Sequence, residues 1–172
     1  MKMAIPGVQQ PDLLPIGQGL RLRKYDGVYA FALPWYQDED LLFLVDGKRT
    51  PYTLEKLGEM YTYLDRHGEL YWIEILEGGA YRPIGDVTFS QEDMPIVIGE
   101  AQFRGKGIGR RVVSALVERG RALGYEKMYV AEIYSYNEGS KRCFEHAGFH
   151  VVEHTKTGAR YAIELGGRPF EA

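Results

Sequence analysis

Arg104-Gly105-Lys106-Gly107-Ile108-Gly109 lies between an apolar run at 96–98 and a stretch of helical periodicity that begins near Gly107. Glycine at three alternate positions lets the backbone approach a ligand closely, because no Cβ stands in the way. The start of the following helix offers unpaired N–H groups and the positive end of a helix dipole. Residues 104–111 contain four basic side chains and no acidic one. The segment therefore predicts a binding site for a phosphate or a similar anion.

Two common phosphate motifs do not fit this loop. A Walker loop has four residues between its first Gly and its Gly-Lys pair, and a Ser or Thr follows the pair. Here five residues separate Gly99 from Gly105, and Gly107 follows Lys106. A dinucleotide loop has two residues before its third glycine, but here Gly109 comes one residue early and Arg110 follows it. The pattern that fits is [Q/R]-x-x-G-x-[G/A], with Arg104, Gly107 and Gly109 at its three defined positions.

A second motif follows further along the chain. Residues 137–149 read Asn-Glu-Gly-Ser-Lys-Arg-Cys-Phe-Glu-His-Ala-Gly-Phe. This stretch resembles the N-x-x-[A/S]-x-x-x-[Y/F]-E-x-x-G-F element of the GNAT superfamily of acyl-CoA N-acyltransferases, and the glycine loop resembles that superfamily's pyrophosphate loop. The resemblance covers residues 84–165 and is strongest to aminoglycoside 6′-N-acetyltransferases and Rim-type N-terminal protein acetyltransferases.

The resemblance implies acetyl-CoA as the cofactor. The strand at 97–101 would pair with the pantetheine arm, the loop amides would hold the pyrophosphate, and the start of the second motif would contact the cofactor. Taken alone, Asn137 could equally be an ordinary helix-start residue. The cofactor-binding residues that the resemblance implies are Ile98, Gly99, Arg104, Gly105, Lys106, Gly107, Ile108, Gly109, Arg110, Asn137 and Ser140.

Glu132 stands where related enzymes carry the carboxylate assigned to general-base work. Strand alternation predicts that Val130, Glu132 and Tyr134 share one face. An unpaired carboxylate in a core is costly, which favours an orientation toward a cleft. The competing interpretation is a surface glutamate on an edge strand, and Glu100 and Asp93 are then the reserve candidates.

The sequence departs from the family at Phe144. Many relatives have a tyrosine there that protonates the leaving thiolate, and a phenyl ring has no proton to give. The general acid is therefore unassigned. Direct attack by a neutral amine, with a solvent proton for the thiolate, needs no such residue.

A third segment, residues 35–40, places two aromatic side chains beside three acids. Aromatic faces and carboxylates suit a cationic amine, so Trp35, Tyr36 and Asp38 are predicted to bind the acceptor substrate. A solvated acidic loop would explain the same pattern.

Composition limits the other possibilities. A chain of 172 residues with no linker predicts a single domain over 1–172, with its cofactor-binding core at 84–165. A net charge of −3 with no long apolar run predicts a cytoplasmic protein that binds neither membrane nor nucleic acid. One cysteine excludes an internal disulfide, and the His150 and His154 pair lacks the further ligands that a metal site requires.

Periodicity predicts an α/β fold. Strands are expected at 20–25, 70–76, 84–90, 93–101 and 127–134, with a final hairpin formed by 149–154 and 160–165. Helices are expected from Thr53 to Gly68, from Gly107 to Gly124, and over 138–147. The region 29–44 reads as helical or irregular and broken at Pro34. The resemblance implies a GNAT-type mixed, mostly antiparallel central sheet with a βαβ acyl-CoA-binding core.

The sequence as a whole therefore predicts an N-acetyltransferase that moves an acetyl group from acetyl-CoA to a primary amine by direct transfer. The acceptor is a small-molecule amine or a peptide N-terminus, and the sequence leaves a homodimer open. One alternative is an N-terminal protein acetyltransferase, and another is a catalytically silent module that binds coenzyme A as a sensor.

Overall fold

The computed structural model describes residues 3–166 of the chain. The chain forms two compact units whose segments interleave along the sequence. Unit 1 comprises Met1–Thr88 and Ile96–Phe103, and unit 2 comprises Phe89–Pro95 and Arg104–Ala172. The predicted strand at 93–101 is therefore divided between the two units, and the glycine loop that follows it belongs to unit 2.

Unit 1 is built on a five-stranded sheet in the order β1–β2–β3–β4–β5. The strands are β1 (Leu13–Gly17), β2 (Leu20–Lys24), β3 (Glu69–Glu77), β4 (Ala80–Phe89) and β5 (Ile96–Ile98). The pairs β1/β2, β2/β3 and β4/β5 are antiparallel. Gly78 and Gly79, with φ of 59° and 84°, connect β3 to β4, as expected for a two-residue hairpin turn.

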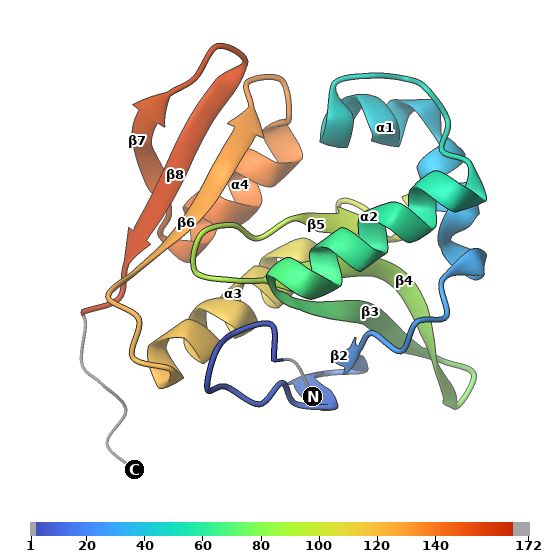
Figure 1. Ribbon diagram of the computed structural model, residues 1–172, viewed down its shortest axis with the longest axis horizontal. Helices are drawn as coiled ribbons and strands as arrows, with labels where there is room; N and C mark the ends of the chain where they lie inside the picture. The colour runs from blue at the N-terminus through green and yellow to red at the C-terminus, as the bar shows by residue number, and fades with distance from the viewer. Residues whose placement is uncertain (1–2, 167–172) are drawn as a thin grey trace. The chain divides into compact units, whose positions relative to one another are not determined.

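Four helical segments belong to unit 1: η1 (Ala30–Gln37), α1 (Glu39–Asp46), α2 (Leu54–His67) and η2 (Ala101–Phe103). Helix α2 confirms its predicted bounds, because Thr53 Oγ1 accepts a hydrogen bond from Lys56 N at 3.1 Å and the helix ends at Gly68. Its buried Tyr61 ring lies 5.2 Å from the ring of Trp72 on β3. The helix therefore packs on the sheet, as Figure 1 shows for α2 and β3.

The core of unit 1 is rich in aromatic side chains; its buried members are Trp35, Tyr36, Tyr52, Tyr61 and Trp72. Asp86 of β4 lies among them with a relative exposure of 1%. Its Oδ2 accepts hydrogen bonds from the phenols of Tyr36 at 2.7 Å and Tyr61 at 2.8 Å. Burial raises the pKa of this carboxyl to about 6, although the two phenols favour the ionised form.

Unit 2 contains a three-stranded antiparallel sheet in the order β6–β8–β7. Its elements are α3 (Ile108–Ala122), β6 (Lys127–Tyr134), α4 (Glu138–Ala147), β7 (His150–His154) and β8 (Gly158–Glu164). The three strands lie side by side in Figure 1. Helix α3 packs closely on β6, since a Cβ on Gly120 would lie 2.3 Å from Met128 Sδ. The apolar face of α3 is buried; its residues include Ile108, Val112, Val113, Leu116 and Val117.

The fold is mixed α/β with antiparallel sheets, as predicted, but the strands divide differently. Within residues 3–166, β5 and β6 belong to separate sheets, whereas the sequence led us to expect one central sheet in which they run parallel. β5 also covers only Ile96–Ile98 of the expected 93–101. It ends at a β-bulge, because Gly99 N–H and Glu100 N–H both donate to the carbonyl of Ile84, at 2.8 and 3.3 Å.

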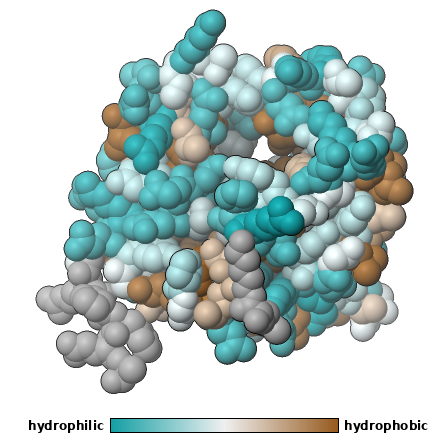
Figure 2. Space-filling view, viewed as in Figure 1, coloured by the Kyte–Doolittle hydropathy of each residue, from teal (hydrophilic) through white to brown (hydrophobic). Residues whose placement is uncertain are grey.

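No helix in the described part of the chain is long and apolar enough to cross a bilayer. The face of the molecule in Figure 2 is mainly hydrophilic, with smaller hydrophobic areas between the hydrophilic residues. Nor do residues 3–166 contain a group of three or more His, Cys, Asp or Glu side chains that could hold a metal ion.

Candidate functional site

The glycine loop in unit 2 leads into the N-terminus of α3. Gly105 and Gly107 have φ of 71° and 82°, and a Cβ at either position would meet nothing within 4 Å. The requirement for glycine there is therefore conformational rather than steric. Gly107 is the N-cap of α3, no side chain caps this helix within the described residues, and its first turn has no acid. The N–H groups of the first turn are thus presented as donors for an anion.

Gly109 has a different reason to be glycine. It lies inside α3 without a positive φ, and a Cβ there would lie 3.1 Å from Cys143 Sγ on α4. The absence of a side chain lets α3 and α4 approach each other. Burial raises the pKa of the Cys143 thiol, which Arg110 and Arg142 oppose. Cys143 is therefore a packing residue rather than an activated nucleophile.

The second motif forms α4 over its predicted bounds, and Asn137 is its N-cap. Asn137 Oδ1 accepts a hydrogen bond from Ser140 N at 3.2 Å, which places both predicted cofactor-binding residues in one helical turn. Phe144 is buried and packs edge-on against Phe149, with ring centroids 5.2 Å apart. Phe144 therefore packs α4 against the rest of unit 2, whereas the first turn of the helix lies at the surface.

Glu132 lies on the surface of β6, and its environment differs from the one that strand alternation predicts. A register shift between Val130 and Ile133 marks a β-bulge, so both of these residues are buried and Glu132 is exposed. Glu132 Oε2 accepts hydrogen bonds from the hydroxyls of Thr155 and Thr157, the latter at 2.8 Å. Hydrogen bonds from Thr155 and then Thr157 lower the pKa of Glu132 below its usual value.

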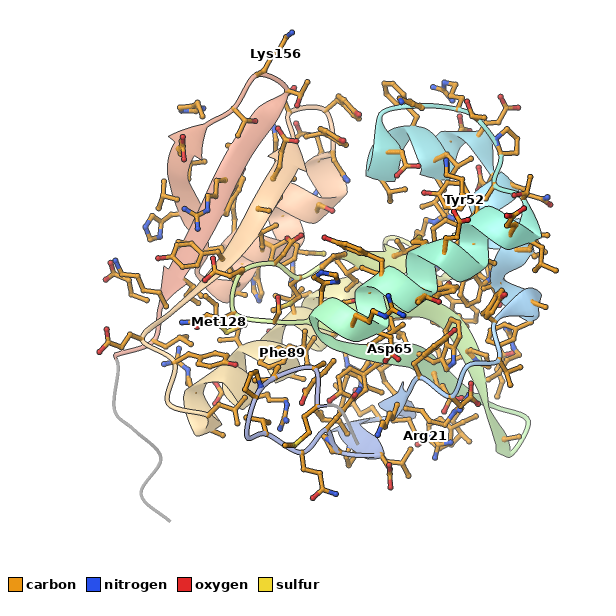
Figure 3. The ribbon with its side chains drawn as sticks, viewed as in Figure 1. Arg21, Tyr52, Asp65, Phe89, Met128 and Lys156 are labelled. Atoms are coloured by element: carbon orange, nitrogen blue, oxygen red, sulfur yellow. The ribbon has the colours of Figure 1, made fainter. Side chains whose placement is uncertain are left out.

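These bonds tie Glu132 to the turn between β7 and β8. Lys156 lies at the tip of this turn and points away from the sheet in Figure 3. Near the end of β6, the rings of Tyr134 and Tyr136 stack with centroids 5.4 Å apart. Burial, then Tyr134 and then the charge of Glu132 raise the pKa of Tyr136. Glu132 is therefore an ionised, solvent-accessible carboxylate with a defined orientation.

The two reserve carboxylates are engaged elsewhere. In unit 2, Asp93 Oδ1 accepts from Met94 N and Ala131 N, both at 3.0 Å, and burial raises its pKa despite these bonds. In unit 1, Glu100 forms an ion pair with Arg82 and accepts from Gln102 Nε2 at 2.8 Å. Each carboxylate holds a loop in place.

In unit 1, the end of β5 lies against η1. Ile98 pairs with Gly85 of β4, and the bulge at Gly99 follows directly. A Cβ on Gly99 would lie 2.2 Å from Cδ2 of the Trp35 indole. Glycine at 99 is therefore required by the close approach of an aromatic ring within unit 1.

The predicted acceptor-binding residues have structural partners in unit 1. Trp35 and Tyr36 are 6% and 2% exposed, and the Tyr36 hydroxyl binds Asp86. Asp38 caps α1 by accepting from Asp40 N and Leu41 N at 3.1 and 3.3 Å. Asp40 pairs with Arg49 at 2.8 Å and remains largely exposed. The acids of this segment, rather than its aromatic rings, are the groups accessible to a solute.

Asp86 is a residue that the sequence patterns do not predict, although it carries a weak signal. A lone acid inside the apolar stretch Ile84-Gly-Asp-Val-Thr-Phe89 is unusual for a buried strand. Its phenol partners come from η1 and α2, and their proximity depends on tertiary packing.

Comparison with known proteins identifies the family. The profile of the Acetyltransferase (GNAT) family matches residues 32–149. The uncharacterized protein MJ1062 of Methanocaldococcus jannaschii is 34% identical over 93 residues, which are 51% of this chain and 19% of that protein. The chain thus matches about a fifth of the length of this relative.

Two solved acetyltransferases have a similar fold. The structure of RimL, a ribosomal L7/L12 alpha-N-protein acetyltransferase in complex with coenzyme A, has a TM-score of 0.71 and 15% identity, covering 91% of this chain and 99% of that one. Aminoglycoside acetyltransferase AAC(6')-Ib in complex with coenzyme A has a TM-score of 0.66 and 20% identity, covering 84% and 94%. The fold likeness that the two motifs imply is confirmed. Since the family profile spans more than half of its length, the chain belongs to the Acetyltransferase (GNAT) family.

Proposed function

We propose that this chain is an N-acetyltransferase that moves an acetyl group from acetyl-CoA to a primary amine. The observation that carries this proposal is the N-terminus of α3, where Gly105 and Gly107 have positive φ, no side-chain cap is present in the described structure, and basic residues are concentrated. Such a helix start binds phosphate through its N–H groups and dipole. The complexes of RimL and AAC(6')-Ib with coenzyme A support the same cofactor here.

Each unit has its own role in this proposal. In unit 2, the backbone amides between Arg104 and Arg110 bind the pyrophosphate, and Asn137 and Ser140 contact the cofactor from the first turn of α4. In unit 1, the backbone of Ile98 and Gly99 pairs with the pantetheine arm. The positive charges of Arg104, Lys106 and Arg110 attract the anionic cofactor from solution.

The reaction requires one carbon–nitrogen bond to form and one carbon–sulfur bond to break. The neutral amine attacks the thioester carbonyl carbon, and the tetrahedral intermediate collapses to the amide and the thiolate of coenzyme A. Glu132, directly or through a water molecule, takes the proton that the attacking nitrogen loses. Because Phe144 has no proton to donate, solvent protonates the thiolate.

The acceptor is proposed to be a cationic amine attracted by the acids Asp38, Glu39 and Asp40, which follow Trp35 and Tyr36 in the sequence. Replacing Asp38, Glu39 and Asp40 together by their amides should raise KM for such an amine and leave KM for acetyl-CoA unchanged. Asn caps a helix as well as Asp does, so α1 should stay intact. The effect should fade with salt, because attraction between exposed charges is screened over about 8–10 Å. Equal KM values for the parent and the triple variant would show that these acids form a solvated loop that does not bind the acceptor.

A catalytically silent coenzyme A-binding module is the second candidate. Phe144 in place of a hydroxyl-bearing residue favours it, as does the engagement of Glu132 with two threonine hydroxyls. A protein N-terminal acetyltransferase differs from the first proposal only in its acceptor.

Thiol release from acetyl-CoA with a panel of amines tests these possibilities. The panel contains aminoglycosides, polyamines and peptides with unmodified N-termini. We expect release that depends on one of these classes. Coenzyme A binding without release would support the silent module, and the absence of binding would overturn the assignment of the glycine loop.

A further inference from the structure

Unit 1 contains a buried carboxylate that the proposed reaction does not use. Asp86 has no basic partner in the described hydrogen-bond network, and both phenols that bind it donate to Oδ2. Tyr36 comes from η1 and Tyr61 from α2, so the carboxylate joins two helices to β4. A buried hydrogen-bonded acid is costly to desolvate and strongly directional once paired. The arrangement therefore fixes where the ring of Tyr36 lies.

Tyr36 follows Trp35 in the same short helix, so fixing one residue constrains the other. The Trp35 indole packs edge-on against Phe31 and Trp72, with ring centroids 5.8 and 6.1 Å away. The ring also lies close to Gly99, where an added Cβ would come within 2.2 Å of it. The indole thus lies directly against the backbone of Gly99.

That backbone is the bulge at the end of β5. Two consecutive N–H groups, of Gly99 and Glu100, share the carbonyl of Ile84, so the ladder cannot continue regularly beyond this point. On the facing strand, a Cβ on Gly85 would lie 2.1 Å from the carbonyl oxygen of Val97. The backbone at the end of β5 is therefore packed closely against β4 on one side and against the Trp35 ring on the other.

We infer that Asp86, Tyr36 and Tyr61 act as positioning residues that hold Trp35 against Gly99 and thereby fix the bulge that presents the donor-binding backbone of β5. We call Asp86, Tyr36, Tyr61 and Trp35 the bulge lock. Its functional consequence, affinity for the acyl donor, rests on the proposed function. Trp35 and Tyr36 then serve the donor through the backbone rather than the acceptor through their side chains.

The first test measures the bulge without any ligand. Tyr36→Phe keeps the ring and removes the hydroxyl that binds Asp86, so amide hydrogen exchange at Gly99 and Glu100 should become faster. Tyr52→Phe is the matched control, because it removes a phenol–carboxylate bond of 2.8 Å to Asp46 in the same aromatic cluster. Tyr52 is labelled in Figure 3. The control should leave exchange at the bulge as in the parent protein.

The second test replaces the carboxylate. Asp86→Asn retains an oxygen that can accept from both phenols, whereas Asp86→Leu has a similar size and no acceptor. We expect Asp86→Leu and Tyr36→Phe to raise Kd for coenzyme A and KM for acetyl-CoA by about five- to tenfold, the order expected for one buried hydrogen bond. KM for the amine should stay unchanged, and Asp86→Asn should bind the donor within about twofold of the parent.

The outcomes separate the lock from the proposed function. If exchange at Gly99 and Glu100 is the same in Tyr36→Phe as in Tyr52→Phe, the lock does not exist. If the parent binds coenzyme A and the lock variants bind it equally well, the lock has no functional consequence and the inference is wrong. If Tyr36→Phe speeds exchange at Gly99 and Glu100 but the parent protein does not bind coenzyme A, the bulge lock is supported and coenzyme A is not the cofactor.

Discussion

Gly107→Val is expected to abolish the stabilisation of this protein by coenzyme A. Gly107 has φ of 82°, a conformation that a β-branched residue avoids, and it forms the N-cap of α3. Valine would either carry strain of about 1–3 kcal/mol or change the path of the loop. The N–H groups of the first turn would then no longer converge on the pyrophosphate.

The measurement is the shift in Tm with added coenzyme A. A ligand at 100 times its Kd stabilises the folded state by about 2.7 kcal/mol, which corresponds to a shift of roughly 5–10 °C for a chain of this size. The parent should show this shift and Gly107→Val should show none. Normal binding by Gly107→Val would mean that the cofactor does not use this loop.

Gly109→Ala is the matched control for this substitution. Gly109 lies within α3 without a positive φ, and its closest obstacle is Cys143 Sγ at 3.1 Å, which a small shift of a side chain can relieve. We expect a modest loss of stability and binding within a few-fold of the parent. A complete loss in both variants would indicate that the packing of α3 on α4, rather than the loop conformation, controls binding.

The elements that the sequence predicted well are those with local signals at both ends. Helix α2 begins at the N-cap Thr53 and ends at Gly68, and α4 likewise begins at the N-cap Asn137 and ends at Gly148. These signals act between residues only a few positions apart, so no knowledge of the tertiary structure is needed. The same is true of the positive φ at Gly105 and Gly107, which only the backbone freedom of glycine allows without strain.

Other elements depend on neighbours that the sequence does not reveal. The strand β1, which the sequence analysis did not predict, includes Pro15; an edge strand tolerates a proline because one side of it needs no ladder partner. The bulge in β6 arises from its pairing with β8, and it reverses the faces that simple alternation assigns around Glu132. Local pattern therefore located this strand correctly and misjudged the direction of its central side chains.

The predicted site residues show the same division. The acidic and aromatic run at 35–40 suggested a surface for a cation, yet its two aromatic side chains are in the core of unit 1. From sequence alone, large aromatic residues suit a core and a binding surface equally well. Here Tyr36 belongs to the core, where its hydroxyl donates to Asp86 on a distant strand. Gly99 likewise owes its identity to Trp35, a contact across more than sixty positions of the chain.

Glu132→Gln is expected to lower acetyl transfer by about 10²–10³-fold near neutral pH, the usual contribution of a general base, with unchanged coenzyme A binding. The hydrogen bonds from Thr155 and Thr157 lower the pKa of Glu132 below its usual value, so protonation of this carboxylate does not limit the reaction near neutral pH. We therefore expect kcat/KM of the parent to fall as the pH drops below neutral because the acceptor amine becomes protonated. The loss in the variant should shrink at high pH, where the amine is deprotonated without help.

The pH–rate profiles of the parent, Glu132→Gln and Thr157→Val distinguish chemistry from structure at this position. Thr157→Val removes one hydroxyl donor from Glu132 and keeps the carboxylate, so its pKa should rise toward the usual value and activity should stay within a few-fold. If Thr157→Val is as inactive as Glu132→Gln, Glu132 acts by holding the β7–β8 turn rather than by accepting a proton. If Glu132→Gln turns over like the parent at neutral pH, the carboxylate is not the base, and Asp93 and Glu100 become the side chains to replace.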